Sequence, residues 1–74
     1  MEELLKILEE VRSDIDFTTE KGLIEHGILD SLDIMEIVAE ISDAFDISVS
    51  PADIIPQNFN SAEALWAMIQ KLKG

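Results

Sequence analysis

The sequence predicts an all-α fold: a small four-helix bundle of three main helices plus one short helix, with a long loop between the first and second helices. Two observations support this class. Apolar residues recur at helical spacing in three separate segments, and no stretch shows β-alternation of useful length. The 74 residues, 47% of them hydrophobic, are enough for one core, so we expect residues 1–74 to form a single domain.

The first predicted helix runs from Glu2 to Val11. Leu4, Leu8 and Val11 recur on one face, and acidic residues decorate the remainder. Acids in the first turn complement the positive end of the helix dipole. We therefore expect an amphipathic helix whose apolar face joins the core.

Residues 13–30 show no clean period and contain Gly22 and Gly27. A connection of about seventeen residues is long for a small domain, and such loops are commonly functional or disordered. Four apolar side chains are available to hold it on the core: Leu23, Ile24, Ile28 and Leu29. We expect an ordered loop that ends at Asp30.

The second predicted helix, from Asp30 to Phe45, has the strongest pattern in the chain. Asp30 suits the N-cap, and Asp33 adds negative charge to the first turn. The predicted core face comprises Ile34, Val38, Ile41 and Phe45. A second face is acidic and comprises Asp33, Glu36, Glu40 and Asp43. A small outward apolar patch beside it comprises Leu32, Met35 and Ala39.

The C-terminal third predicts one short and one long helix. Ser50 followed by Pro51 is typical of a helix start, and Pro56 is expected to end that helix after one or two turns. Asn60, with Glu63 three residues later, predicts a capping box at the start of the last helix. The residues that this helix is expected to bury are Ala62, Leu65, Trp66 and Ile69.

Charge limits the partners. Sixteen acidic and five basic residues give a formal net charge of −11, which disfavours nucleic acid and anionic membranes and favours basic protein surfaces. No apolar run approaches the roughly 20 residues that span a bilayer. The acidic start Met1-Glu2-Glu3 is unlike a secretory signal. We expect a cytoplasmic monomer that does not insert into membranes.

Catalytic chemistry finds little support in the residues. A triad of Ser31, the single histidine His26 and an acid would need a pocket and an oxyanion hole, for which so short a chain has little room. Calcium-loop spacing is matched by Asp14, Asp16, Thr18 and Glu25. Thr19, however, stands where the sharp turn of such a loop normally requires glycine. We expect neither an enzyme nor a metal site.

Ser31 is the residue with the most distinctive position. It follows an acidic N-cap, opens the longest helix and ends a long loop, so its hydroxyl should be exposed. A phosphate on that oxygen would be stabilised by the helix N-terminus. From spacing alone, however, the favoured interpretation is that Ser31 is an ordinary first-turn serine.

The run from Gly27 to Glu36 contains Asp30-Ser31-Leu32 and resembles the attachment motif of acyl carrier proteins. The resemblance extends over essentially the whole chain, including the order of the helices and the segment Pro56–Ser61 before the last helix. It implies that 4′-phosphopantetheine, transferred from coenzyme A by a phosphopantetheinyl transferase, is esterified to Ser31. Asp30 and Leu32 are then the motif neighbours.

The resemblance also implies that the thiol of this arm holds an acyl or aminoacyl thioester and that the carrier itself catalyses nothing. The second helix is then the recognition element for loading and processing enzymes with basic patches. The partner-binding residues expected on it are Asp33, Met35, Glu36, Ala39, Glu40 and Asp43, together with Leu32.

The cargo stays open between a fatty acyl, a polyketide and an aminoacyl group. Leu29 stands where carriers of fatty acid synthesis commonly have a small residue, and Asn58–Ser61 looks closer to stand-alone carriers of D-alanylation or specialised pathways. The rival class is a noncovalent, acidic, helical protein-interaction module. Only the carrier would gain the mass of phosphopantetheine.

Overall fold

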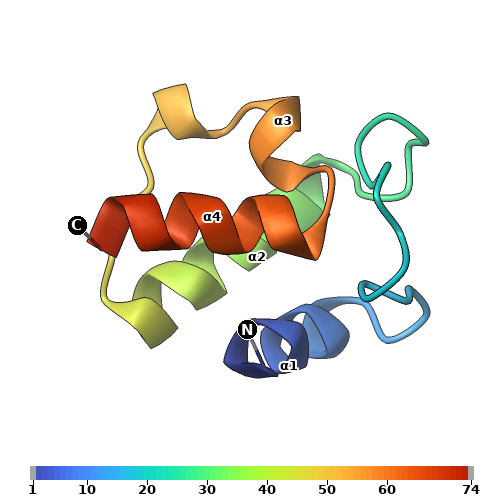
Figure 1. The fold of residues 1–74 in the computed structure, drawn as a ribbon, viewed down its shortest axis with the longest axis horizontal. Coiled ribbons are helices and arrows are strands. Elements are labelled where there is room, and N and C mark those ends of the chain that lie inside the picture. Colours follow the sequence, from blue (N-terminus) through green and yellow to red (C-terminus); the bar gives the residue numbers. More distant parts are fainter. Residues whose placement is uncertain (1, 74) are drawn as a thin grey trace.

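The computed structural model describes residues 2–73, and all of its regular elements are helical (Figure 1). In chain order these are α1 (Glu2–Val11), α2 (Ser31–Phe45), the 3₁₀ helix η1 (Pro51–Asp53), α3 (Pro56–Phe59) and α4 (Ala62–Lys73). The predicted class is confirmed: three main helices, a short helix and a long connection between the first two main helices. No helix in the described part of the chain is long and apolar enough to cross a membrane.

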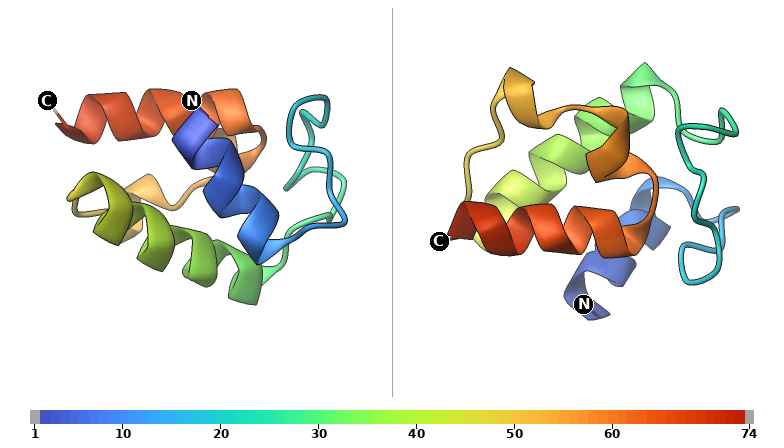
Figure 2. Two further views of the ribbon diagram at one scale, coloured as in Figure 1. Left: turned by 90° about the horizontal axis from the view of Figure 1, so that it is seen from below. Right: turned by 45° about the horizontal axis from the view of Figure 1, so that its top comes forward.

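The helices surround one core. α2 and α4 run in the same general direction, while α1 packs against both from one side, and η1 and α3 lie on the other side (Figures 1 and 2). The long loop closes one end of the bundle, beside α3 and the start of α2 (Figure 2). The start of α2 is therefore the point at which loop, α1 and α3 come together.

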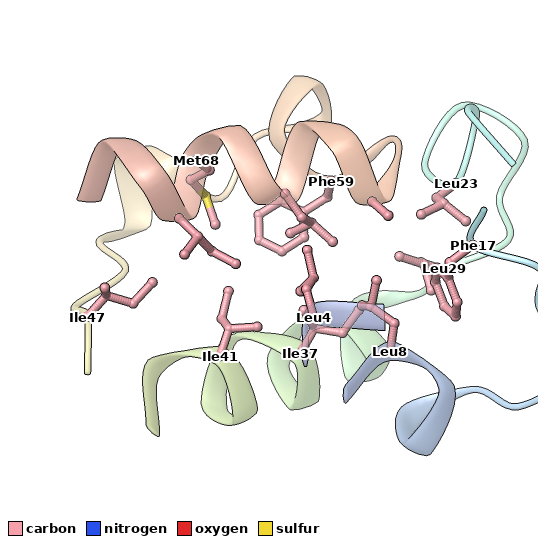
Figure 3. Close-up of a cluster of buried hydrophobic side chains, with 13 residues drawn as sticks. Leu4, Leu8, Phe17, Leu23, Leu29, Ile37, Ile41, Ile47, Phe59 and Met68 are labelled. Atoms are coloured by element: carbon pink, nitrogen blue, oxygen red, sulfur yellow. The ribbon is translucent and has the colours of Figure 1, made fainter. Parts of the chain in front are cut away.

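The core is entirely apolar and draws on every main helix and on the loop (Figure 3). Its members are Leu4, Leu8, Phe17, Leu23, Leu29, Ile37, Ile41, Ile47, Phe59, Ala62, Leu65, Met68 and Ile69. Full burial of one Leu or Ile side chain contributes about 1.5–3 kcal/mol. With no disulfide available, these side chains supply most of the stability of the fold.

The predicted core face of α2 is displaced from the observed one. Ile37 and Ile41 are fully buried, whereas Ile34, Val38 and Phe45 are only partly buried. The reason is that α1 packs on the flank of α2 that carries Ile37. The buried line is thus rotated around the helix toward α1, and the expectation that omitted Ile37 was wrong.

A similar correction applies to α4. Ala62, Leu65 and Ile69 are buried as predicted. The fourth buried residue of α4 is Met68, whereas Trp66 was expected. Trp66 lies at the margin, where its ring meets Phe45 edge-on with centroids 5.9 Å apart. An amphipathic indole is suited to such a half-buried site.

The long loop is ordered, and its anchors are partly those predicted. Leu23 and Leu29 are buried, Ile24 and Ile28 are partly buried, and Phe17, which was not predicted, also enters the core. Gly27 adopts φ 66°, a left-handed conformation that glycine takes without strain.

Asn60 ties this loop to the α3–α4 connection. Its backbone oxygen accepts from the Leu23 N–H at 2.8 Å, and its side-chain oxygen accepts from Ile24 and Glu25 N–H at 3.0 and 3.1 Å. The predicted N-cap role of Asn60 was therefore wrong. Ser61 caps α4 instead, accepting from the Ala64 N–H through its hydroxyl at 3.1 Å.

The short C-terminal elements also differ in detail from the prediction. Ser50 and Asp53 form the capping box of η1, with Asp53 accepting from both the backbone N–H and the hydroxyl of Ser50. Pro56 does not end this helix, because η1 already ends at Asp53. It occupies the first position of α3, where a missing N–H costs no helical hydrogen bond.

Candidate functional site

The first turn of α2 is fixed by a reciprocal capping box. Asp30 is the N-cap, as predicted, and its carboxylate accepts from the Asp33 N–H at 2.9 Å. The Asp33 carboxylate accepts in return from the Asp30 N–H at 3.3 Å. These two bonds satisfy donors that a helix end otherwise leaves unpaired, and they fix the backbone at the position that follows Asp30.

Ser31 occupies that place, as the first residue of α2. It is exposed, and within residues 2–73 its hydroxyl takes part in no hydrogen bond. Ser31 and Leu32 also carry first-turn N–H groups that have no helical acceptor, so positive potential gathers at this point. An anionic group on the Ser31 oxygen would thus find space and a favourable field.

Arg12 braces this turn from the end of α1, and sequence reasoning missed it. Its Nη1 donates to Asp33 Oδ2 at 2.6 Å and lies 3.4 Å from the Ile28 carbonyl oxygen. Its Nε and Nη2 donate to the two carboxylate oxygens of Asp14 at 3.0 and 2.9 Å. The hydrogen bond from Arg12 lowers the pKa of Asp14 below its usual range. One guanidinium thus joins α1, the long loop and α2.

This contact sets Asp33 apart from the other residues expected to meet partners. Its side chain is only 13% exposed and points toward Arg12. Six residues of α2 instead face solvent, and together we call them the outer face: Leu32, Met35, Glu36, Ala39, Glu40 and Asp43. Leu32 and Met35 are 72% and 69% exposed, which is unusually high for large apolar residues.

An apolar pocket of about 180 Å³ lies beside the same end of α2. It is lined by Ile24, Ile34, Ile54, Ile55, Pro56 and Phe59. Ile34 follows Ser31 by about one helical turn. The pocket is close in volume to the roughly 150 Å³ engineered cavity that accepts a molecule such as benzene. Sequence reasoning did not find it, although the adjacent Ile54 and Ile55 outside any periodic segment were a signal.

The loop residues considered for other chemistry have structural partners. His26 Nδ1 lies 3.2 Å from Glu20 Oε1, and its ring stands over Gly22. Asp16 accepts from the backbone and hydroxyl of Thr18, and these bonds lower the pKa of Asp16. No group of three or more potential metal ligands comes together within residues 2–73.

Comparison with known proteins agrees with this geometry. The family model described as "Phosphopantetheine attachment site" matches residues 1–69. The D-alanyl carrier protein of Lactococcus lactis subsp. lactis (strain IL1403) is 35% identical over 65 residues, which cover 88% of this chain and 77% of the relative. That of Streptococcus mutans serotype c is 29% identical over 72 residues, covering 96% and 91%. The chain therefore belongs to the phosphopantetheine-binding carrier proteins, a non-catalytic family with a phosphopantetheine attachment site.

Proposed function

We propose that Ser31 is the residue that bears 4′-phosphopantetheine. The observation that carries this proposal is the exposed, unbonded Ser31 hydroxyl at the start of α2, held between Asp30 and Leu32 on a capped turn. When bound, the prosthetic group supplies a terminal thiol that holds cargo as a thioester, which a chain without cysteine lacks. Asp30 fixes the turn, and the free N–H groups offset the charge of a phosphodiester.

The attachment itself would be carried out by a phosphopantetheinyl transferase. The Ser31 oxygen forms a bond to the phosphorus of the pantetheine phosphate of coenzyme A, and the bond to adenosine 3′,5′-bisphosphate breaks. The hydroxyl proton passes to a base of the transferase. Because coenzyme A is a cytoplasmic metabolite, we infer that the carrier is loaded in the cytoplasm, and we expect it to act there as a monomer.

The outer face is the surface that we infer to meet the transferase and the loading enzymes. Glu36, Glu40 and Asp43 offer charge to basic patches, while Leu32, Met35 and Ala39 offer a small apolar contact. Asp33 was expected among these residues, and its pairing with Arg12 favours an internal role instead.

For the cargo we propose a D-alanyl group. The relatives are named D-alanyl carrier proteins, and they cover most of this chain. The size of the pocket supports a small cargo, because about 180 Å³ beside Ser31 would have to enlarge to shelter a long fatty acyl chain. A D-alanyl thioester carries an ammonium group, which an acidic surface tolerates well.

Intact mass before and after incubation with coenzyme A and a broad-specificity phosphopantetheinyl transferase tests the attachment. We expect one phosphopantetheine on the wild type and on Ser48→Ala, an exposed serine outside the motif, and none on Ser31→Ala. Addition to Ser31→Ala, or none to folded wild type, would refute the assignment.

The cargo is tested on the modified protein with a D-alanine-activating ligase and ATP, in parallel with a fatty acyl ligase. We expect a D-alanyl thioester that hydroxylamine releases, and little acylation with a long-chain acid. Efficient loading of the fatty acid with no D-alanyl product would overturn the cargo while leaving the attachment site intact.

A further inference from the structure

Arg12 occupies an exceptional place in this acidic chain. It is one of five basic residues, and it pairs with the acid of the first turn of α2, two positions beyond Ser31. Attachment of a phosphodiester at Ser31 would add a negative charge to a turn that already contains Asp30 and Asp33. Like charges at such short separation repel by an amount that depends strongly on any nearby counter-charge.

We propose that Arg12 is a positioning residue and the counter-charge of the attachment site, an inference that rests on the proposed attachment at Ser31. The Nη1–Oδ2 contact of 2.6 Å directs the Asp33 carboxylate toward α1, and the side chain of Asp33 remains only 13% exposed there. Asp33 can then serve the capping box with Asp30 while Arg12, which it shares with Asp14, offsets part of its negative charge. The free N–H groups of the first turn remain available to an anion on Ser31.

Two further contacts make this role specific to Arg12. Its forked bond to Asp14 and its approach to the Ile28 carbonyl hold the guanidinium in one orientation. A lysine could supply the charge but not this fork. Lys21 of the long loop forms an ion pair with Glu63 of α4. Because this pair does not involve α2, it serves as the control for the pair between Arg12 and Asp33.

The inference is tested by a thermodynamic cycle between residue 12 and the modification. Urea unfolding of unmodified and modified protein gives the factor by which modification changes the unfolding equilibrium constant. This factor is the unfolding constant of the modified protein divided by that of the unmodified protein. In Arg12→Gln, Asp33 loses its basic partner, and we expect the factor to be about threefold to tenfold larger than in the wild type. An effect of Arg12 on stability alone would alter both forms equally and leave the factor unchanged.

The second arm removes the acid instead of the base. In Asp33→Asn, Arg12 keeps Asp14 but loses its second acidic partner, so the ratio of the unfolding constants of the modified and unmodified protein should be smaller than in the wild type. In the double variant Arg12→Gln/Asp33→Asn the factor should return close to the wild-type value. Asp33→Asn keeps a side-chain oxygen for the capping box, so this arm remains measurable even where Arg12→Gln does not fold.

Lys21→Gln is the control, and it should leave the factor unchanged. An unchanged factor in Arg12→Gln, or in Asp33→Asn where Arg12→Gln cannot be measured, overturns the inference. A wild-type protein that accepts no phosphopantetheine at Ser31 is a different result, because it refutes the proposed attachment itself. Mass spectrometry of each sample before unfolding separates the two outcomes.

Discussion

The helix α2 carries two pairs of large apolar residues, one buried in the core and the other exposed to solvent. Ile37 and Ile41 are completely buried against α1 and α4, while Leu32 and Met35 are 72% and 69% exposed on the outer face. One pair on this helix therefore belongs to the hydrophobic core, and the other pair leaves most of its surface in solvent. The exposure of Leu32 and Met35 is the observation behind the proposal that this face meets partner proteins.

The largest effect should come from the buried pair. Truncation of Ile37 to Ala should lower the free energy of unfolding by about 2–5 kcal/mol, because it leaves a cavity in a small core. Ile37→Val, which should cost about 0.5–1.5 kcal/mol, remains measurable if the alanine variant unfolds. Urea unfolding followed by far-ultraviolet circular dichroism gives both values. Leu32→Ala, the matched exposed change, should remain within about 0.5 kcal/mol of wild type; equal losses would contradict the division.

Truncation of the exposed pair, Leu32 and Met35, should affect recognition by the transferase more than stability. Leu32→Ala combined with Met35→Ala should reduce kcat/KM of the phosphopantetheinyl transferase for this carrier about tenfold, because an apolar anchor is worth more than about 1 kcal/mol at an interface. Initial rates with wild-type and variant carriers check this. An unchanged kcat/KM would show that these side chains do not contact the transferase.

A smaller effect is expected from the charges beside that pair. Glu36→Lys with Glu40→Lys should slow association with a basic partner several-fold at low salt, and the difference should shrink as salt rises. Stopped-flow or surface plasmon resonance rates measure it. The same charge change at Glu2 and Glu3, near the other end of α2, is the control. A salt-independent defect would indicate misfolding instead of lost attraction.

The smallest effect concerns three acids of the loop, Asp14, Asp16 and Glu20, whose carboxylates accept hydrogen bonds. The pKa values of Asp14, Asp16 and Glu20 are lowered chiefly by hydrogen bonds from Arg12, Thr18 and the Gly22 N–H, respectively. A pKa below the unfolded value stabilises at neutral pH, and that stability is lost as pH falls through the folded value. Amide protection factors should therefore fall in the loop below about pH 4, before they fall in α4. Simultaneous opening of both regions would contradict this order.

The three main helices, the N-cap at Asp30 and the ordered loop were predictable, because each depends on local spacing or on one capping residue, whereas α3 was not predicted. The errors arose where tertiary contacts decide. Ile37 and Met68 are buried because of which flank a neighbouring helix covers, and Asn60 prefers loop N–H groups to a helix end.

The candidate site shows the same division. Ser31 and the outer face follow from the motif and from helical spacing. The Arg12–Asp33 pair joins residues 21 positions apart, and the pocket joins three segments that meet only in the folded chain. No local pattern contains such information.

Asn60 has a mechanical consequence for the pocket beside Ser31. Its side chain and backbone bind the loop at Leu23–Glu25, so Ile24 of the loop and Phe59 of α3 are joined across the pocket by short hydrogen-bonded links. Separation of these two walls would break bonds to Asn60 before it created space. The walls therefore shift together or hardly at all, so the amide of Asn60, which does not line the pocket, limits how far the pocket can widen.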